Sequence, residues 1–193
     1  MQEGNPSPAR APLDALSSLE VRLCRAAGER PGGALLARIV AAQAMGLGVL
    51  PPDLELGAVQ YRRLMEHYFP GIGVTPGSPS VPPDRPQERR DLYELMWAHR
   101  AGRDLCESWI AAIVARACLG GNHLWQDLGL AHREMLTRLM ETHFPGLAER
   151  NEGDMKWKKF LYRQLCLAEG LRICRAPSCQ VCPDYADCFG PET

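Results

Sequence analysis

Four of the eight cysteines of this chain fall within fifteen positions near its C-terminal end, and this cluster constrains the structure more than any other feature. The four residues are Cys174, Cys179, Cys182 and Cys188, spaced C-x4-C-x2-C-x5-C. Pro177 and Pro183 interrupt the run, and they favour turns because proline fixes φ and lacks an N–H. A short, turn-rich segment can direct four thiols at one centre. The spacing therefore predicts a metal or metal–sulfur site.

The spacing favours an iron–sulfur cluster over zinc, without excluding zinc. Structural zinc sites usually pair two C-x2-C units across a longer spacer, whereas this run has a single C-x2-C. Several iron atoms need thiolates from different directions, which suits short and uneven spacings. A zinc-stabilised helical interaction protein and a simple iron–sulfur electron-transfer protein therefore stay open as alternatives.

The sequence as a whole indicates the cellular compartment in which this site would function and the partners it lacks. The first ten residues have no apolar core of a secretory signal, and no apolar stretch reaches the roughly 18–20 residues that span a bilayer. We therefore expect a cytoplasmic protein without a membrane partner, in which clustered cysteines bind metal more often than they form disulfides. A formal net charge of −1 gives no general attraction to nucleic acid.

The segment that leads into the cysteines is strongly basic. Six cations against the single acid Glu169 give it a charge of +5; they are Lys156, Lys158, Lys159, Arg163, Arg172 and Arg175. Nearby cations lower thiol pKa values and offset the charge of an anionic cluster. Of these residues we expect Lys158, Lys159, Arg163 and Arg175 to support the site, the alternative being an ordinary solvated helix face.

The rest of the chain has helical periodicity and no strand alternation, which predicts an all-α fold. The expected parts are a flexible tail over 1–12, helices over 13–72, a Pro-rich connector over 73–90, helices over 91–150, and a basic helix plus cysteine motif over 151–193. Asp53 and Asp154 are candidate N-caps of the helices that follow them. We expect residues 13–193 to form one globular domain.

An internal repeat supports this organisation. Residues 63–72 match residues 138–147 at seven of ten positions, each ending in Phe-Pro-Gly, which predicts two tandem helical repeats packed as one bundle. In the second copy Val49 is replaced by His123 and Ala44 by Cys118. His123 is therefore a candidate ligand or proton donor, although a histidine between helices more often serves as a cap.

The other cysteines fall on helical stretches, where a small buried hydrophobe is the commoner role. They are Cys24, Cys106, Cys118 and Cys166. Cys106 and Cys118 lie in the second copy, and whether either one supplies a ligand stays open at this point.

The stretch from Met155 to Cys166, with the following C-x4-C-x2-C-x5-C and Phe189-Gly190, resembles the NifQ family of nitrogen-fixation proteins. His123-Leu-Trp-Gln-Asp-Leu-Gly-Leu130 is similar to the middle region of that family. The resemblance implies a molybdenum donor for the iron–molybdenum cofactor of nitrogenase, and not an enzyme. It implies a molybdenum–iron–sulfur cluster on Cys174, Cys179, Cys182 and Cys188, with molybdate as the molybdenum source. The implied partners are the NifEN scaffold and the Fe protein NifH.

Overall fold

The computed structural model describes residues 11–170 and 185–192, and every regular element in those ranges is an α-helix. The helices are α1 (Ala11–Ala27), α2 (Gly33–Ala44), α3 (Gly57–Tyr68), α4 (Pro86–Ala98), α5 (Cys106–Cys118), α6 (Leu124–Asp127), α7 (Arg133–His143), α8 (Pro145–Ala148), α9 (Trp157–Ala168) and α10 (Tyr185–Phe189). The expected all-α class is confirmed for this part of the chain. None of these helices is long and apolar enough to cross a membrane.

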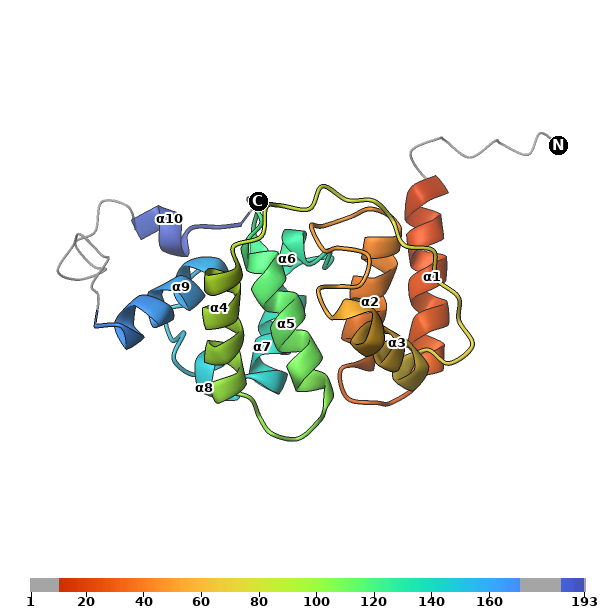
Figure 1. The fold of residues 1–193 in the computed structure, drawn as a ribbon. Helices are drawn as coiled ribbons and strands as arrows, with labels where there is room; N and C mark the ends of the chain where they lie inside the picture. The colour runs from red at the N-terminus through yellow and green to blue at the C-terminus, as the bar shows by residue number, and fades with distance from the viewer. Residues whose placement is uncertain (1–10, 171–184, 193) are drawn as a thin grey trace.

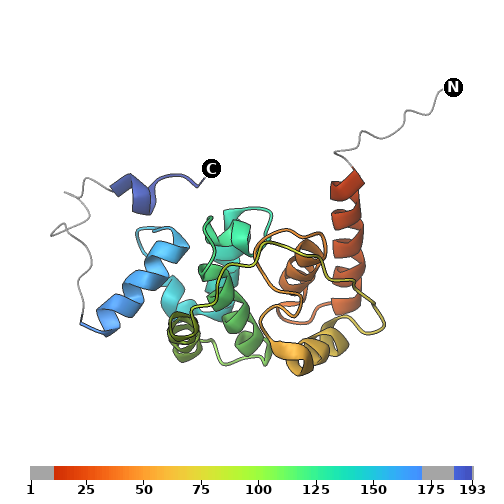
Figure 2. The same cartoon turned by 45° about the horizontal axis from the view of Figure 1, so that its top comes forward.

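The helices follow one another along the molecule in three groups (Figure 1). α1, α2 and α3 form one end, α4, α5 and α7 the middle, and α9 and α10 the end opposite α1, as Figure 2 also shows. α5 is the most enclosed helix, and its Ile110, Ile113 and Val114 have no exposed surface. Apolar residues on several faces of α5 give it this central place.

The first and middle groups meet through close backbone contacts. A Cβ added at Gly48 would come within 2.6 Å of the Asp127 carbonyl oxygen, so only glycine allows the loop after α2 to approach α6. Arg38 Nε donates a hydrogen bond to the Gly129 carbonyl at 2.9 Å. Trp109 Nε1 donates to Gln60 Oε1 at 3.3 Å. These contacts join the two groups into one packed unit.

The proline-rich connector runs along the surface from α3 to α4 (Figure 1). Gln43 Nε2 donates to the Gly77 carbonyl, and Arg116 Nη2 donates to the Pro82 carbonyl. The connector is shorter than the sequence predicts, since α4 begins at Pro86 and not at residue 91. Proline suits the first turn of a helix because its fixed φ is helical and its missing N–H has no partner there.

Two predicted N-caps are wrong. Asp53 accepts hydrogen bonds from the Glu55 and Gly57 backbone N–H groups at 3.1 Å each, but α3 begins only at Gly57. The positive φ of Leu54 and of Glu55 places a turn between Asp53 and the helix.

The second is Asp154, which also has a positive φ and accepts a hydrogen bond from Arg133. Lys156 is the residue that precedes α9. Aspartate favours helix caps and left-handed turns alike, so residue type alone does not separate the two.

α6 ends at Asp127, and α7 begins only at Arg133. Gly129 lies between them with a φ of 72°, which no helix accommodates. The short α6 begins directly after His123, and this places His123 in a connection between α5 and α7.

The two Phe-Pro-Gly segments have closely similar backbones. Phe69 has φ −129° and ψ 51°, and Phe144 has φ −135° and ψ 54°. Each backbone N–H donates, at 2.8 Å, to the carbonyl of the methionine four residues earlier. This local agreement supports the tandem repeat, which as a whole stays a prediction, as does the division into parts.

Candidate metal centre

The cysteine motif is described at one of its four positions. Cys174, Cys179 and Cys182, and with them Arg175, lie outside the described residues. Cys188 lies in α10, is half-buried, and packs at the edge of the hydrophobic core with Phe189. The ligand set of four cysteines therefore stays a prediction.

α10 is docked on the turn that precedes α9. The Lys156 backbone N–H donates to the Cys188 carbonyl at 2.7 Å, and Lys156 Nζ donates to the Ala186 carbonyl at 3.2 Å. A Cβ added at Gly153 would come within 3.0 Å of the Phe189 ring, so Gly153 allows the ring to lie against the backbone. These contacts fix one end of the cysteine motif to the helical body.

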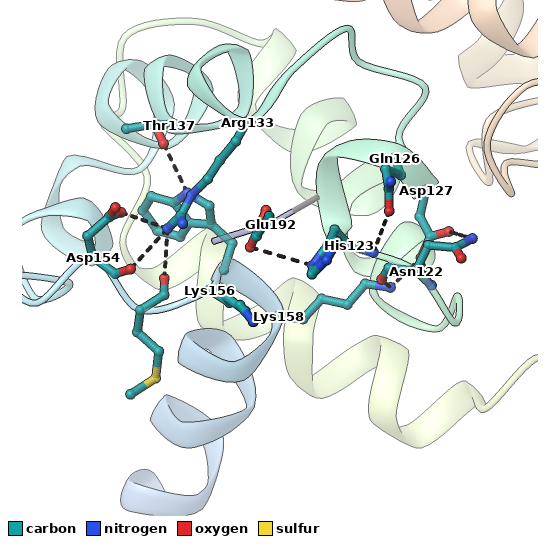
Figure 3. Close-up of polar contacts among 12 residues, drawn as sticks. Asn122, His123, Gln126, Asp127, Arg133, Thr137, Asp154, Lys156, Lys158 and Glu192 are labelled. Atoms are coloured by element: carbon teal, nitrogen blue, oxygen red, sulfur yellow. Dashed lines mark hydrogen bonds and ion pairs between the residues drawn. The ribbon is translucent and has the colours of Figure 1, made fainter. Parts of the chain in front are cut away.

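The turn itself is held from two sides. Asn151 Oδ1 accepts from the Met155 N–H, and Asn151 Nδ2 donates to the Met155 carbonyl, both at 2.9 Å. Arg133 Nη2 donates to Asp154 Oδ1 at 2.7 Å. The residue that follows the turn is Trp157, whose Nε1 donates to Thr137 Oγ1 of α7 (Figure 3). The turn under α10 is therefore hydrogen-bonded to α7 and to the residues around it.

Lys158 is engaged inside the protein. Its Nζ donates to the carbonyls of Gly120 at 2.9 Å and Asn122 at 2.7 Å, and to the carboxylate of Asp127 (Figure 3). Asp127 has no exposed surface, and its carboxylate also accepts from the Asn122 N–H and side-chain amide. Lys158 therefore neutralises a buried acid and joins α9 to the loop after α5.

Lys159 and Arg163 behave differently from Lys158. Both lie on exposed positions of α9, and neither forms an ion pair within the described part of the chain. An exposed cation without an acid partner is free to attract an anion. Of the three expected supporting cations that the structure describes, these two remain suited to that role, and the role of Arg175 stays a prediction.

His123 precedes α6, as expected of a residue between helices. Its backbone N–H donates to Gln126 Oε1 at 3.1 Å, which closes the first turn. Its ring Nδ1 lies 3.7 Å from Glu192 Oε1 (Figure 3). Sequence reasoning missed Glu192, because a single acid after Pro191 has no pattern that would single it out.

Cys106 and Cys118 are buried thiols. Burial raises the pKa of Cys118 to about 12, against the lowering effect of the nearby Lys158 ammonium. Burial also raises the pKa of Cys106 to about 12. Because the thiolate is the form that binds metal, the raised pKa disfavours metal binding by both residues. This agrees with their interpretation as small hydrophobes.

Within residues 11–170 and 185–192, no three side chains of His, Cys, Asp or Glu are grouped so as to hold a metal ion. Any complete site must therefore use residues beyond those ranges or groups that the chain does not supply. The described part provides Cys188, the His123–Glu192 pair and the exposed cations of α9.

Comparison with known proteins gives one consistent result. The NifQ family model matches residues 35–190. The chain is 46% identical over 170 residues to "Protein NifQ" of Azotobacter vinelandii, covering 81% of this chain and 87% of that one. It is 36% identical over 161 residues to "Protein NifQ" of Rhodobacter capsulatus, covering 83% and 88%. The match to "Protein NifQ" of Klebsiella pneumoniae is 53% over 113 residues, covering 52% and 68%.

No solved structure matches the chain significantly. The family match runs from the first turn of α2 through α10 and includes the basic helix, the docked Cys188 and the whole cysteine motif. Together with the two relatives that cover most of both chains, this shows that the chain belongs to the NifQ family.

Proposed function

We propose that this protein is a molybdenum carrier in nitrogen fixation, which holds molybdenum with iron and sulfur and donates it to the synthesis of the iron–molybdenum cofactor. Membership of the NifQ family is the observation that carries the proposal. The chemistry of the chain supports it, because four closely spaced cysteines offer the thiolates that iron–sulfur clusters need.

A carrier differs from an enzyme in what its site must do. The site must hold metal until a partner arrives and then release it, so it belongs at the surface. Cys188 is half-buried at one end of the molecule, on a helix that rests on a single turn (Figures 1 and 2). We propose that contact with the NifEN scaffold and the Fe protein NifH loosens this helix and exposes the cargo.

We propose that the exposed cations of α9 guide the anionic molybdenum source. Lys159 and Arg163 suit this role, while Lys158 has its donors engaged by Asp127 and two carbonyls. Replacing Lys159 and Arg163 by glutamate should slow molybdenum loading from molybdate. The matched control is Arg150→Glu, an exposed cation outside α9, which should leave loading unchanged. Equal loading in all three proteins would rule out guidance by α9.

Elemental analysis after anaerobic purification tests the function itself. Molybdenum together with iron and sulfide is expected, whereas zinc alone indicates a structural zinc protein, and iron and sulfide without molybdenum indicate an electron carrier. Cys179→Ala should lower the molybdenum and iron content, and Cys166→Ala, a half-buried cysteine of α9, is its control. Unchanged metal content in Cys179→Ala would refute the ligand assignment.

A further inference from the structure

The carboxylate of Glu192 is buried, and the described residues do not neutralise its charge with a close ion pair or hydrogen bond. Its side chain is only 4% exposed, and its Oε2 has no hydrogen-bond partner among the residues that the structure describes. Its Oε1 lies 3.7 Å from His123 Nδ1, which is longer than a hydrogen bond. Buried carboxylates are normally paired, hydrogen-bonded or bound to metal. Within residues 11–170 and 185–192, Glu192 therefore has no positive group at hydrogen-bond distance from its oxygens.

The cations that surround Glu192 in Figure 3 are engaged elsewhere. Lys158 donates to Asp127 and to two carbonyls, and Lys156 Nζ donates to the Ala186 carbonyl. Arg133 donates to Asp154 and to the Met155 carbonyl. Within the described part of the chain, His123 is the one charged or chargeable partner that Glu192 has.

The pair has the chemistry of a metal site. An imidazole nitrogen and a carboxylate oxygen each bind a transition metal at roughly 2.0–2.2 Å, so one ion can bridge two atoms that are 3.7 Å apart. A carboxylate repels an oxyanion such as molybdate, so the ligand must carry positive charge. Glu192 also follows Cys188 by four residues, on a segment that Lys156 ties to the body.

We propose that His123 and Glu192 are nitrogen and oxygen ligands of the metal that this protein carries, in addition to its thiolates. Imidazole and carboxylate are harder ligands than thiolate and suit a harder metal than the iron of an iron–sulfur cluster. Given the proposed function, on which this identification rests, the pair binds the molybdenum. The side chain of His123 is 30% exposed, so the metal is reachable from solvent and from a partner.

Spectroscopy of the intact, anaerobically purified protein tests the pair. In the wild type we expect hyperfine coupling to a histidine nitrogen in pulsed EPR, identified by ¹⁵N-histidine labelling, and nitrogen or oxygen scatterers in K-edge X-ray absorption at molybdenum. His123→Asn should abolish the coupling, and Glu192→Gln should remove one light scatterer. Each variant should lose metal to a chelator about tenfold faster or more.

The matched controls are His132→Asn and Glu134→Gln. They change an exposed His–Glu pair in which His132, just before α7, has its Nδ1 2.8 Å from Oε2 of Glu134 in the first turn of α7. Both controls should retain the wild-type spectra and metal release. Histidine coupling that survives in His123→Asn, or wild-type spectra in both site variants, would overturn the pair. Iron or zinc in place of molybdenum would overturn the proposed function alone. The same variants would then be measured by X-ray absorption at the K-edge of the metal that is present. A protein without metal would overturn both.

Discussion

Lys158 and Asp127 form a buried ion pair whose two halves depend on each other. Asp127 has no exposed surface, so removal of the Lys158 ammonium leaves an unneutralised charge in the interior. We expect Lys158→Met to lower the free energy of unfolding by about 3 kcal/mol or more, as measured by urea denaturation. The adjacent Lys159→Met, at an exposed position, should change it by no more than about 0.5 kcal/mol.

A double variant separates the ion pair from simple loss of packing. If the uncompensated carboxylate is the cause, Asp127→Asn combined with Lys158→Met should recover part of the lost stability. Equal losses in the single and the double variant would contradict this account, and the effect would then lie in the packing of the lysine stem between α9 and the loop after α5.

Neighbouring residues of one type have opposite roles here, which limits what sequence reasoning achieves. Lys158 and Lys159 are identical in type and adjacent in sequence, yet one lies against Asp127 and the other in solvent. Their difference depends on which face of α9 packs on the rest of the protein, and this depends on contacts with residues more than thirty positions away, such as those of Lys158 with Gly120, Asn122 and Asp127. The basic character of the helix was predictable from the sequence. Which lysine is buried against Asp127 and which is exposed to solvent was not.

The helices themselves were more predictable than their starts. Apolar periodicity predicted helices over 13–72 and 91–150 and a basic helix after residue 150, and α2, α3, α5, α6, α7, α8 and α9 all lie within these ranges. The starts of α3 and α9 were wrong because Asp53 and Asp154 stabilise turns with positive φ, which have the same residue preference as caps. The cysteine spacing predicts a metal–sulfur site, which stays a prediction, whereas the proximity of Glu192 to His123 comes only from the fold.

The contacts that hold α10 on the turn before α9 should determine how often α10 opens locally. Five residues form no stable helix alone, so α10 depends on the Phe189 ring against Gly153 and on the hydrogen bonds of Lys156. Phe189→Ala should therefore raise amide hydrogen exchange across residues 185–189 by roughly tenfold, which is the effect of about 1.4 kcal/mol on an opening equilibrium. Exchange in α5 should not change.

The control for this experiment is Leu167→Ala, which removes an exposed leucine from α9, close in sequence to the cysteine motif but outside the contact with Gly153. It should leave exchange in α10 as in the wild type. Unchanged exchange in Phe189→Ala would mean that the ring does not hold the helix. Faster metal loss in Phe189→Ala, together with faster exchange, would link the docking of α10 to retention of the cargo.

The molecule as a whole depends on the contact between its first and middle groups of helices. Gly32, just before α2, packs against α5 and the end of α7: an added Cβ would lie 3.2 Å from Cys106 Sγ and 3.6 Å from His143 Cε1. His143 is only 4% exposed and ends α7. A titratable ring therefore lies where two groups of helices meet, so its protonation acts on the whole fold.

This placement predicts how stability depends on pH. Burial lowers the pKa of His143 below its ordinary value of 6.5, an effect that exceeds the opposing influence of Glu107 and Asp104. The unfolded chain then binds a proton at higher pH than the folded one does. The contribution of neutral His143 to the free energy of unfolding is therefore complete above about pH 6.5. It falls as the pH drops below that value, by at most about 1.4 kcal/mol per pH unit for one proton.

Replacing the ring isolates this contribution. His143→Phe should have a smaller loss of unfolding free energy between pH 7.5 and 5.5 than the wild type, as measured by urea denaturation at both values. His132→Asn, which changes an exposed histidine, should keep the wild-type difference. If His143→Phe also keeps it, other groups govern the acid sensitivity of the fold. A smaller difference in His143→Phe alone would show that the contact between the two groups of helices titrates through this one residue.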